Sequence, residues 1–131
     1  MIYAILKHLC EKGDLMLFLE YPKCSTCKKA KSFLEENGAV FTARNIKEEK
    51  PSYDELKKWH AQSKLPLKRF FNTSGLLYKE LQLKDKLPSM REEEQFLLLA
   101  SDGMLVKRPL LIEKDRVLVG FRSAEWEALL K

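Results

Sequence analysis

The sequence has no apolar run that approaches the roughly 20 residues a membrane-spanning helix needs, and it has only three cysteines. Its five glycines and five prolines are scattered, and it contains no low-complexity tract, internal repeat or linker. An odd cysteine count argues against a secreted framework of paired disulfides and favours a reducing compartment. With 131 residues, the chain is long enough to bury a core without such staples. We therefore expect a single folded domain in the cytoplasm. We expect it to be monomeric and not to associate with a membrane.

Positively and negatively charged residues are interspersed along the chain. The 24 lysines and arginines exceed the 19 acidic residues and give a net charge of +5, but both signs alternate throughout. This pattern favours a solvated mixed surface over a surface that binds nucleic acid. No metal site is indicated, because one cysteine pair stands without a second ligand pair and both histidines are remote from it in sequence. Motifs for flavin, nicotinamide or haem are not visible either.

Residues 1–15 do not fit a secretory signal peptide, because the apolar stretch is short, His8 interrupts it and no small-residue cleavage site follows. Codons for residues 12–14 can spell a purine-rich ribosome-binding sequence, which suggests Met16 as the native start. The alternative is a short N-terminal helix packed on the domain. We treat 1–15 as an N-terminal extension and 16–131 as the domain.

The most informative feature is the pair Cys24 and Cys27, which lies between an apolar run at 16–19 and a helix-like stretch at 28–37. At a strand-to-helix corner, unpaired N–H groups and the positive end of the helix dipole stabilise a thiolate. The second thiol lies one helical turn on, so it can attack a mixed disulfide formed at the first. Nearby positive charge is supplied by Lys23, Lys28 and Lys29. The pair therefore predicts redox chemistry.

The order of the expected elements is β-α-β, then helices, then β-β-α. Strands are expected at residues 17–21, 40–46, 110–113 and 117–120. Helical segments are expected at residues 26–37, 52–60, 65–71 and 76–83. A further helix is expected to begin at residue 89 and to end at residues 102–103, and the last helix is expected to begin at residue 123. This order is the thioredoxin-like arrangement: an α/β three-layer fold with a mixed sheet and, here, a helical insertion over about residues 51–103.

Two capping boxes are expected to open helices of the insertion, one formed by Ser52 and Glu55 and the other by Ser89 and Glu92. Apolar side chains are interpreted as core rather than as a cofactor site: Phe96, Trp126 and the leucines at 97–99.

Three arginines, Arg69, Arg108 and Arg122, each lie at the end of an expected element rather than on a regular face. A guanidinium keeps its charge at any working pH and binds oxyanions or carboxylates through two parallel N–H groups. Taken singly, each arginine also fits a solvated or capping role. Their positions at element ends allow them to converge on Cys24. Three further residues receive structural interpretations: Tyr21 packs at the rim of the cysteine pocket, while Asn72 and Ser74 turn the backbone.

Four separated segments together resemble the arsenate reductase/Spx (ArsC-like) family of the thioredoxin-like superfamily. They are YPKCSTCKKA at 21–30, FFNTSG at 70–75, DGMLVKRP at 102–109 and VGFR at 119–122. The likeness runs from about Met16 to the C-terminus and is greatest to small, uncharacterised bacterial proteins that resemble arsenate reductases.

The resemblance implies a role for each matching residue. Cys24 corresponds to the nucleophilic cysteine, and Arg69, Arg108 and Arg122 correspond to the arginines that hold arsenate and the arseno-thiol intermediate. Pro109 corresponds to the cis proline beside the active-site cysteine. The implied activity is a thiol-dependent oxidoreductase without a bound cofactor, whose disulfide is reduced by thioredoxin, glutaredoxin or glutathione.

Cys27 departs from the glutaredoxin-coupled arsenate reductases, in which glutathione supplies the second thiol. It provides an internal resolving thiol, as in Spx-type members, so the substrate is either a small oxyanion or a disulfide. The alternative function is an Spx-like redox-sensing regulator that binds the α subunit of RNA polymerase through residues 44–52. A structural domain with vestigial thiols is a third interpretation.

Overall fold

The computed structural model describes residues 16–130; the predictions for residues 1–15 lie outside this range. Its centre is a four-stranded mixed sheet in the order β2-β1-β3-β4. β1 (Met16–Glu20) pairs in parallel with β2 (Phe41–Asn45) and antiparallel with β3 (Leu110–Glu113), which forms a hairpin with β4 (Arg116–Val119). The predicted mixed sheet is confirmed.

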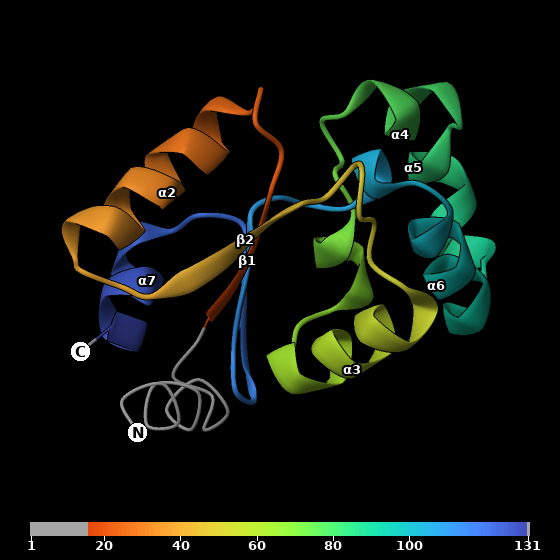
Figure 1. Ribbon diagram of the computed structural model, residues 1–131. Coiled ribbons are helices and arrows are strands. Elements are labelled where there is room, and N and C mark those ends of the chain that lie inside the picture. Colours follow the sequence, from red (N-terminus) through yellow and green to blue (C-terminus); the bar gives the residue numbers. More distant parts are fainter. Residues whose placement is uncertain (1–15, 131) are drawn as a thin grey trace.

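Helices cover both faces of this sheet (Figure 1). α2 (Ser25–Glu36) and α7 (Ser123–Leu130) lie on one face, and α3 (Tyr53–Ser63), α4 (Leu76–Glu80), α5 (Leu83–Lys86) and α6 (Glu92–Ser101) lie on the other. Adjacent strand residues are therefore both buried: Phe18 packs in the cluster of α2 and α7, and Leu19 packs in the cluster of the insertion. The result is the three-layer, thioredoxin-like α/β fold predicted from the sequence.

The register of the sheet brings distant segments to one edge. Leu19, near the end of β1, pairs with Leu110 at the start of β3, and Leu110 pairs with Val119 at the end of β4. The residues that follow β1, precede β3 and follow β4 therefore emerge together. This edge is where the candidate site forms.

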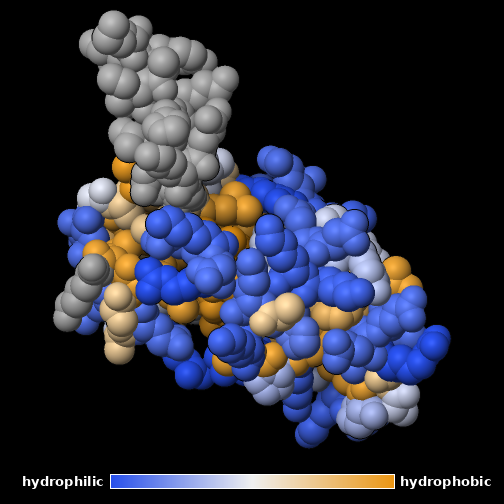
Figure 2. Space-filling model, turned by 90° about the horizontal axis from the view of Figure 1, so that it is seen from below, coloured by the Kyte–Doolittle hydropathy of each residue, from blue (hydrophilic) through white to orange (hydrophobic). Residues whose placement is uncertain are grey.

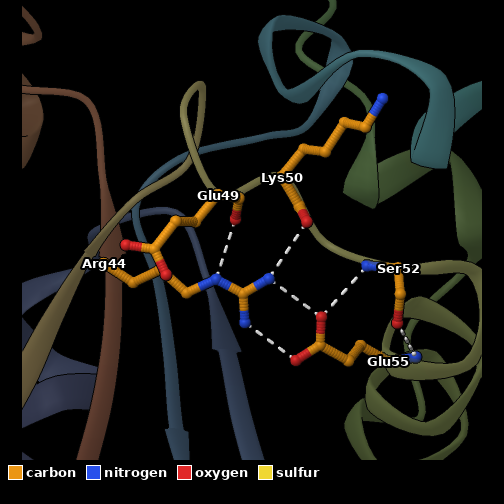
Figure 3. Close-up of polar contacts among 5 residues, drawn as sticks. All are labelled: Arg44, Glu49, Lys50, Ser52 and Glu55. Carbon is orange, nitrogen blue, oxygen red and sulfur yellow. Dashed lines mark hydrogen bonds and ion pairs between the residues drawn. The ribbon is translucent and has the colours of Figure 1, made fainter.

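The connection from β2 to α3 is held by one arginine (Figure 3). Arg44 donates to both carboxylate oxygens of Glu55 at 2.8 and 2.9 Å, and to the carbonyl oxygens of Glu49 and Lys50 at 2.8 and 3.0 Å. The predicted capping box is confirmed, since Ser52 Oγ accepts from the Glu55 amide and Glu55 accepts from the Ser52 amide. One carboxylate thus caps α3 and anchors it to the sheet.

Three details of the insertion differ from the sequence prediction. The segment expected as one helix at 76–83 is two short helices, α4 and α5, because Gln82 between them has a left-handed φ of 54°. The second capping box is wrong: Ser89 Oγ donates to the Lys86 carbonyl, and Glu94 instead accepts from the Arg91 amide at the start of α6. Leu97 is 57% exposed rather than core.

On the side seen in Figure 2, hydrophilic residues predominate among the described residues, and apolar residues occur in groups between them. Within residues 16–130, no helix has the length and apolar character to cross a membrane.

Candidate functional site

Cys24 is the N-cap of α2, and Cys27 lies one turn inside the helix. The Cys27 amide donates to the Cys24 sulfur at 3.3 Å. Cys27 is fully buried because it shares the sheet-facing side of α2 with Ala30 and Leu34, whereas Cys24 is partly exposed. Both are free thiols. The geometry gives a pair with one accessible sulfur and one hidden sulfur.

The two thiols differ in acidity. Burial raises the pKa of Cys24, but the thiol and amide of Cys27 and the guanidinium of Arg108 outweigh it and hold that pKa below its ordinary value. Burial raises the pKa of Cys27 to about 12, and the neighbouring Cys24 adds to the shift. Arg108 is the cation that acts on the sulfur, whereas the lysines at 23, 28 and 29 are exposed to solvent. These shifts favour the thiolate at Cys24 and the protonated thiol at Cys27.

The three predicted arginines and Cys24 line one cleft of about 370 Å³. Arg69 comes from the 3₁₀ turn η2 (Leu67–Phe70), Arg108 from the segment before β3, and Arg122 from the loop after β4. The other lining residues are Thr26, Asn72, Ser74, Gly75, Lys107, Val119, Gly120 and Phe121. None of these described lining residues is acidic, so the cleft suits an anion.

Arg108 is partly buried and precedes the first residue of β3 by two positions. Its peptide bond to Pro109 is cis, as the resemblance implied, and the Pro109 carbonyl accepts from the Gly120 amide at 2.8 Å. Its guanidinium carbon lies 5.1 Å from the centroid of the Tyr21 ring. Nε and Nη1 are buried and have no hydrogen-bond partner among the described residues. Buried unpaired donors are costly, and a bound oxyanion would satisfy them.

Four residues that the sequence analysis did not assign to the site line the cleft: Thr26, Asn72, Ser74 and Lys107. Asn72 and Ser74 do turn the backbone, since the Asn72 carbonyl accepts from the Gly75 amide, but both also line the cleft. Lys107 and Thr26 line it too and were not predicted. The signal for Lys107 was its place beside Arg108, which puts a further cation at the same edge of the sheet.

The described residues offer little for a metal ion. No group of three or more histidine, cysteine, aspartate or glutamate side chains within residues 16–130 is placed to hold one.

The sequence is similar to a family model and to several known proteins. A model of the ArsC family matches residues 19–129. The uncharacterized protein YusI of Bacillus subtilis is 53% identical over 112 residues, which are 86% of this chain and 95% of that protein. The global transcriptional regulator Spx 1 of Oceanobacillus iheyensis is 30% identical, over 79% of this chain and 78% of that protein.

Solved structures show the same relationship. A crystal structure of a Bacteroides fragilis protein described as related to the ArsC family has a TM-score of 0.86 and 57% identity, over 88% of this chain and 97% of that one. An arsenate reductase from Vibrio cholerae has a TM-score of 0.77 and 25% identity, over 89% of this chain and 98% of that one.

Proposed function

The chain belongs to the ArsC family, and from this premise we propose that it is a thiol-dependent oxidoreductase that reduces a small oxyanion or a disulfide. One observation carries the proposal: Cys24, whose pKa is lowered, lines a cleft with three arginines, and Cys27, whose pKa is raised, lies buried one helical turn behind it. An electron-transfer dithiol alone has no need of so many convergent cations. The cleft supports a substrate or intermediate that bears negative charge.

For an oxyanion such as arsenate, the Cys24 thiolate attacks arsenic, and one oxygen leaves as water after protonation. The arginines Arg69, Arg108 and Arg122 compensate the charge of the adduct, with Arg108 supplying its two unpaired N–H groups. A second thiol then attacks the Cys24 sulfur. The sulfur–arsenic bond breaks, its electron pair stays on arsenic, and As(V) becomes As(III).

Cys27 is the internal candidate for that second thiol. Its amide already contacts the Cys24 sulfur, so the two residues need little movement to form a disulfide. Burial and, to a smaller extent, Cys24 raise the pKa of Cys27, and formation of the adduct removes the contribution of the Cys24 charge. The Cys24–Cys27 disulfide is then reduced by thioredoxin, or by glutaredoxin with glutathione.

The proposal is tested by assaying arsenate reduction and disulfide reduction, each with thioredoxin and with glutaredoxin plus glutathione. We expect Cys24→Ser to abolish every activity. Cys27→Ser is the matched control: it should lose thioredoxin-coupled turnover and keep turnover in which glutathione replaces the internal thiol. Absence of turnover of both substrates with both reductants would refute an enzymatic role.

A second candidate function rests on the 30% identity with Spx 1 and on the cysteine pair. In this role the chain is a redox-sensing regulator that binds the α subunit of RNA polymerase through residues 44–52. The Arg44–Glu55 contact holds that segment in a defined shape. A pull-down with purified α subunit, with and without peroxide, tests this role; binding that is absent in both states would exclude it.

A further inference from the structure

A second cleft, of about 360 Å³, adjoins the cleft that contains Cys24. It is lined by Pro66, Lys68, Arg69, Phe71, Thr73 and Lys107. Arg69 and Lys107 line both clefts, so they form a shared wall. The two clefts are therefore neighbours, and Arg69 and Lys107 lie between them.

The chemistry of the second cleft suits an anionic group on an apolar stem. Three cations, Lys68, Arg69 and Lys107, and the Thr73 hydroxyl face no acidic lining residue. None of the three takes part in the ion pairs formed within residues 16–130. Phe71 supplies an apolar wall against which carbon atoms of a ligand can pack.

The backbone around this cleft is fixed by pairing between the two segments that form it. The Lys107 amide donates to the Phe70 carbonyl at 2.8 Å, and Phe71 forms an isolated bridge with Val106. The Phe71 amide in turn donates to the Lys68 carbonyl. The backbone that carries these cations is therefore tied by hydrogen bonds between the two segments.

We propose that the second cleft binds a carboxylate on one half of a disulfide substrate, so that the protein selects extended anionic disulfides over neutral ones. This inference rests on the proposed function and names its substrate class. A bare tetrahedral oxyanion leaves the second cleft empty, since the first cleft alone is of a size that holds small organic ligands. An extended anion uses the cations of both.

The reaction is ordinary thiol–disulfide exchange. The Cys24 thiolate attacks one sulfur of the substrate, the substrate S–S bond breaks, and the leaving thiolate departs with the electron pair. Cys27 then loses its proton to solvent and attacks the Cys24 sulfur, which releases the second half as a thiolate. The protein dithiol loses two electrons, and the substrate disulfide gains them.

The test uses two aromatic disulfides of similar shape, the dianionic 5,5′-dithiobis(2-nitrobenzoate) and the neutral 4,4′-dithiodipyridine, with reduced protein in a single turnover. The readout is the ratio of the two rate constants, because a change in the thiolate fraction of Cys24 affects both rates alike. We compare Lys68→Glu with the control Lys23→Glu. Lys23 precedes Cys24 directly and is exposed, but it lines neither cleft.

We expect Lys68→Glu to lower the anionic-to-neutral rate ratio by about tenfold, as for loss of one close charge pair. Lys23→Glu should lower it by about twofold or less. An equal or larger effect of Lys23→Glu would show a diffuse field and overturn the subsite, as would an unchanged ratio in Lys68→Glu. Failure of the proposed function is distinguishable, because turnover with thioredoxin and with glutaredoxin plus glutathione would then be absent, whereas the single-turnover rate ratio would still report on the subsite.

Discussion

The ring of Tyr21 lies against the guanidinium of Arg108, with 5.1 Å between the ring centroid and the guanidinium carbon. An aromatic face holds a cation without consuming its N–H groups. The contact therefore holds Arg108 while Nε and Nη1 have no hydrogen-bond partner within residues 16–130. Tyr21, expected from the sequence at the rim of the cysteine pocket, is not among the residues that line the cleft, but its ring contacts the cation that lowers the pKa of Cys24.

Replacing Tyr21 by leucine should release Arg108. A cation–π contact contributes about 1 kcal/mol, so we expect the affinity for an oxyanion to fall by about fivefold. The pKa of Cys24 should rise toward its ordinary value as the cation moves away. Inhibition of Cys24 alkylation by arsenate, measured over a range of pH, reports both changes.

Tyr21→Phe is the matched control, because it keeps the ring and removes only the hydroxyl. It should behave like the wild-type protein in both measurements. If the phenylalanine variant showed the full loss, the hydroxyl rather than the ring face would be responsible, and the positioning role would be wrong.

Glu55→Gln should destabilise the protein by about 1–2 kcal/mol, because it weakens two charge-assisted hydrogen bonds to Arg44 at a partly solvated site. Urea unfolding at neutral pH measures the change. Glu49→Gln removes the same charge and leaves the carbonyl that Arg44 uses, so it should cost much less.

The same residue predicts a dependence on acid. The Arg44 side chain, against a smaller opposing effect of burial, holds the pKa of Glu55 below its ordinary value. Its contribution is therefore present above the pKa of the unfolded chain and is lost as the pH falls through the folded value. The free-energy difference between wild type and Glu55→Gln should shrink in that acidic range, and a constant difference would contradict this explanation.

Cys27 should make the reduced protein less stable in alkali. Because burial raises its pKa to about 12, its contribution is complete below the pKa of a cysteine in the unfolded chain and is lost as the pH rises toward the folded value. The free energy of unfolding should fall more steeply above pH 9, the ordinary value, in wild type than in Cys27→Ser. Parallel curves for the two proteins would show that Cys27 is not buried as described.

Local sequence signals predicted much of the fold. The Ser52–Glu55 box and the hairpin of β3 and β4 depend on neighbouring residues, and both are confirmed. The box at Ser89 failed because that side chain completes the preceding turn instead. Leu97 was misassigned because a run of three leucines is wider than the buried side of one helix.

The residues of the candidate site that belong to short sequence motifs could be predicted from the sequence. Cys24, Cys27 and the cis bond before Pro109 belong to such motifs. The contact between Tyr21 and Arg108 could not be predicted, because the register of β1 with β3 creates it. The second cleft arises in the same way, from pairing between segments that are distant in sequence.

The most direct test of the account is the pH dependence of iodoacetamide alkylation, followed separately at Cys24 and Cys27 in the reduced protein. We expect iodoacetamide to alkylate Cys24 rapidly at mildly acidic pH and to alkylate Cys27 slowly up to neutral pH. Cys24→Ser should remove the rapid reaction. If Cys24 titrated like an ordinary cysteine, or both thiols reacted equally at that pH, the assigned chemistry would be contradicted.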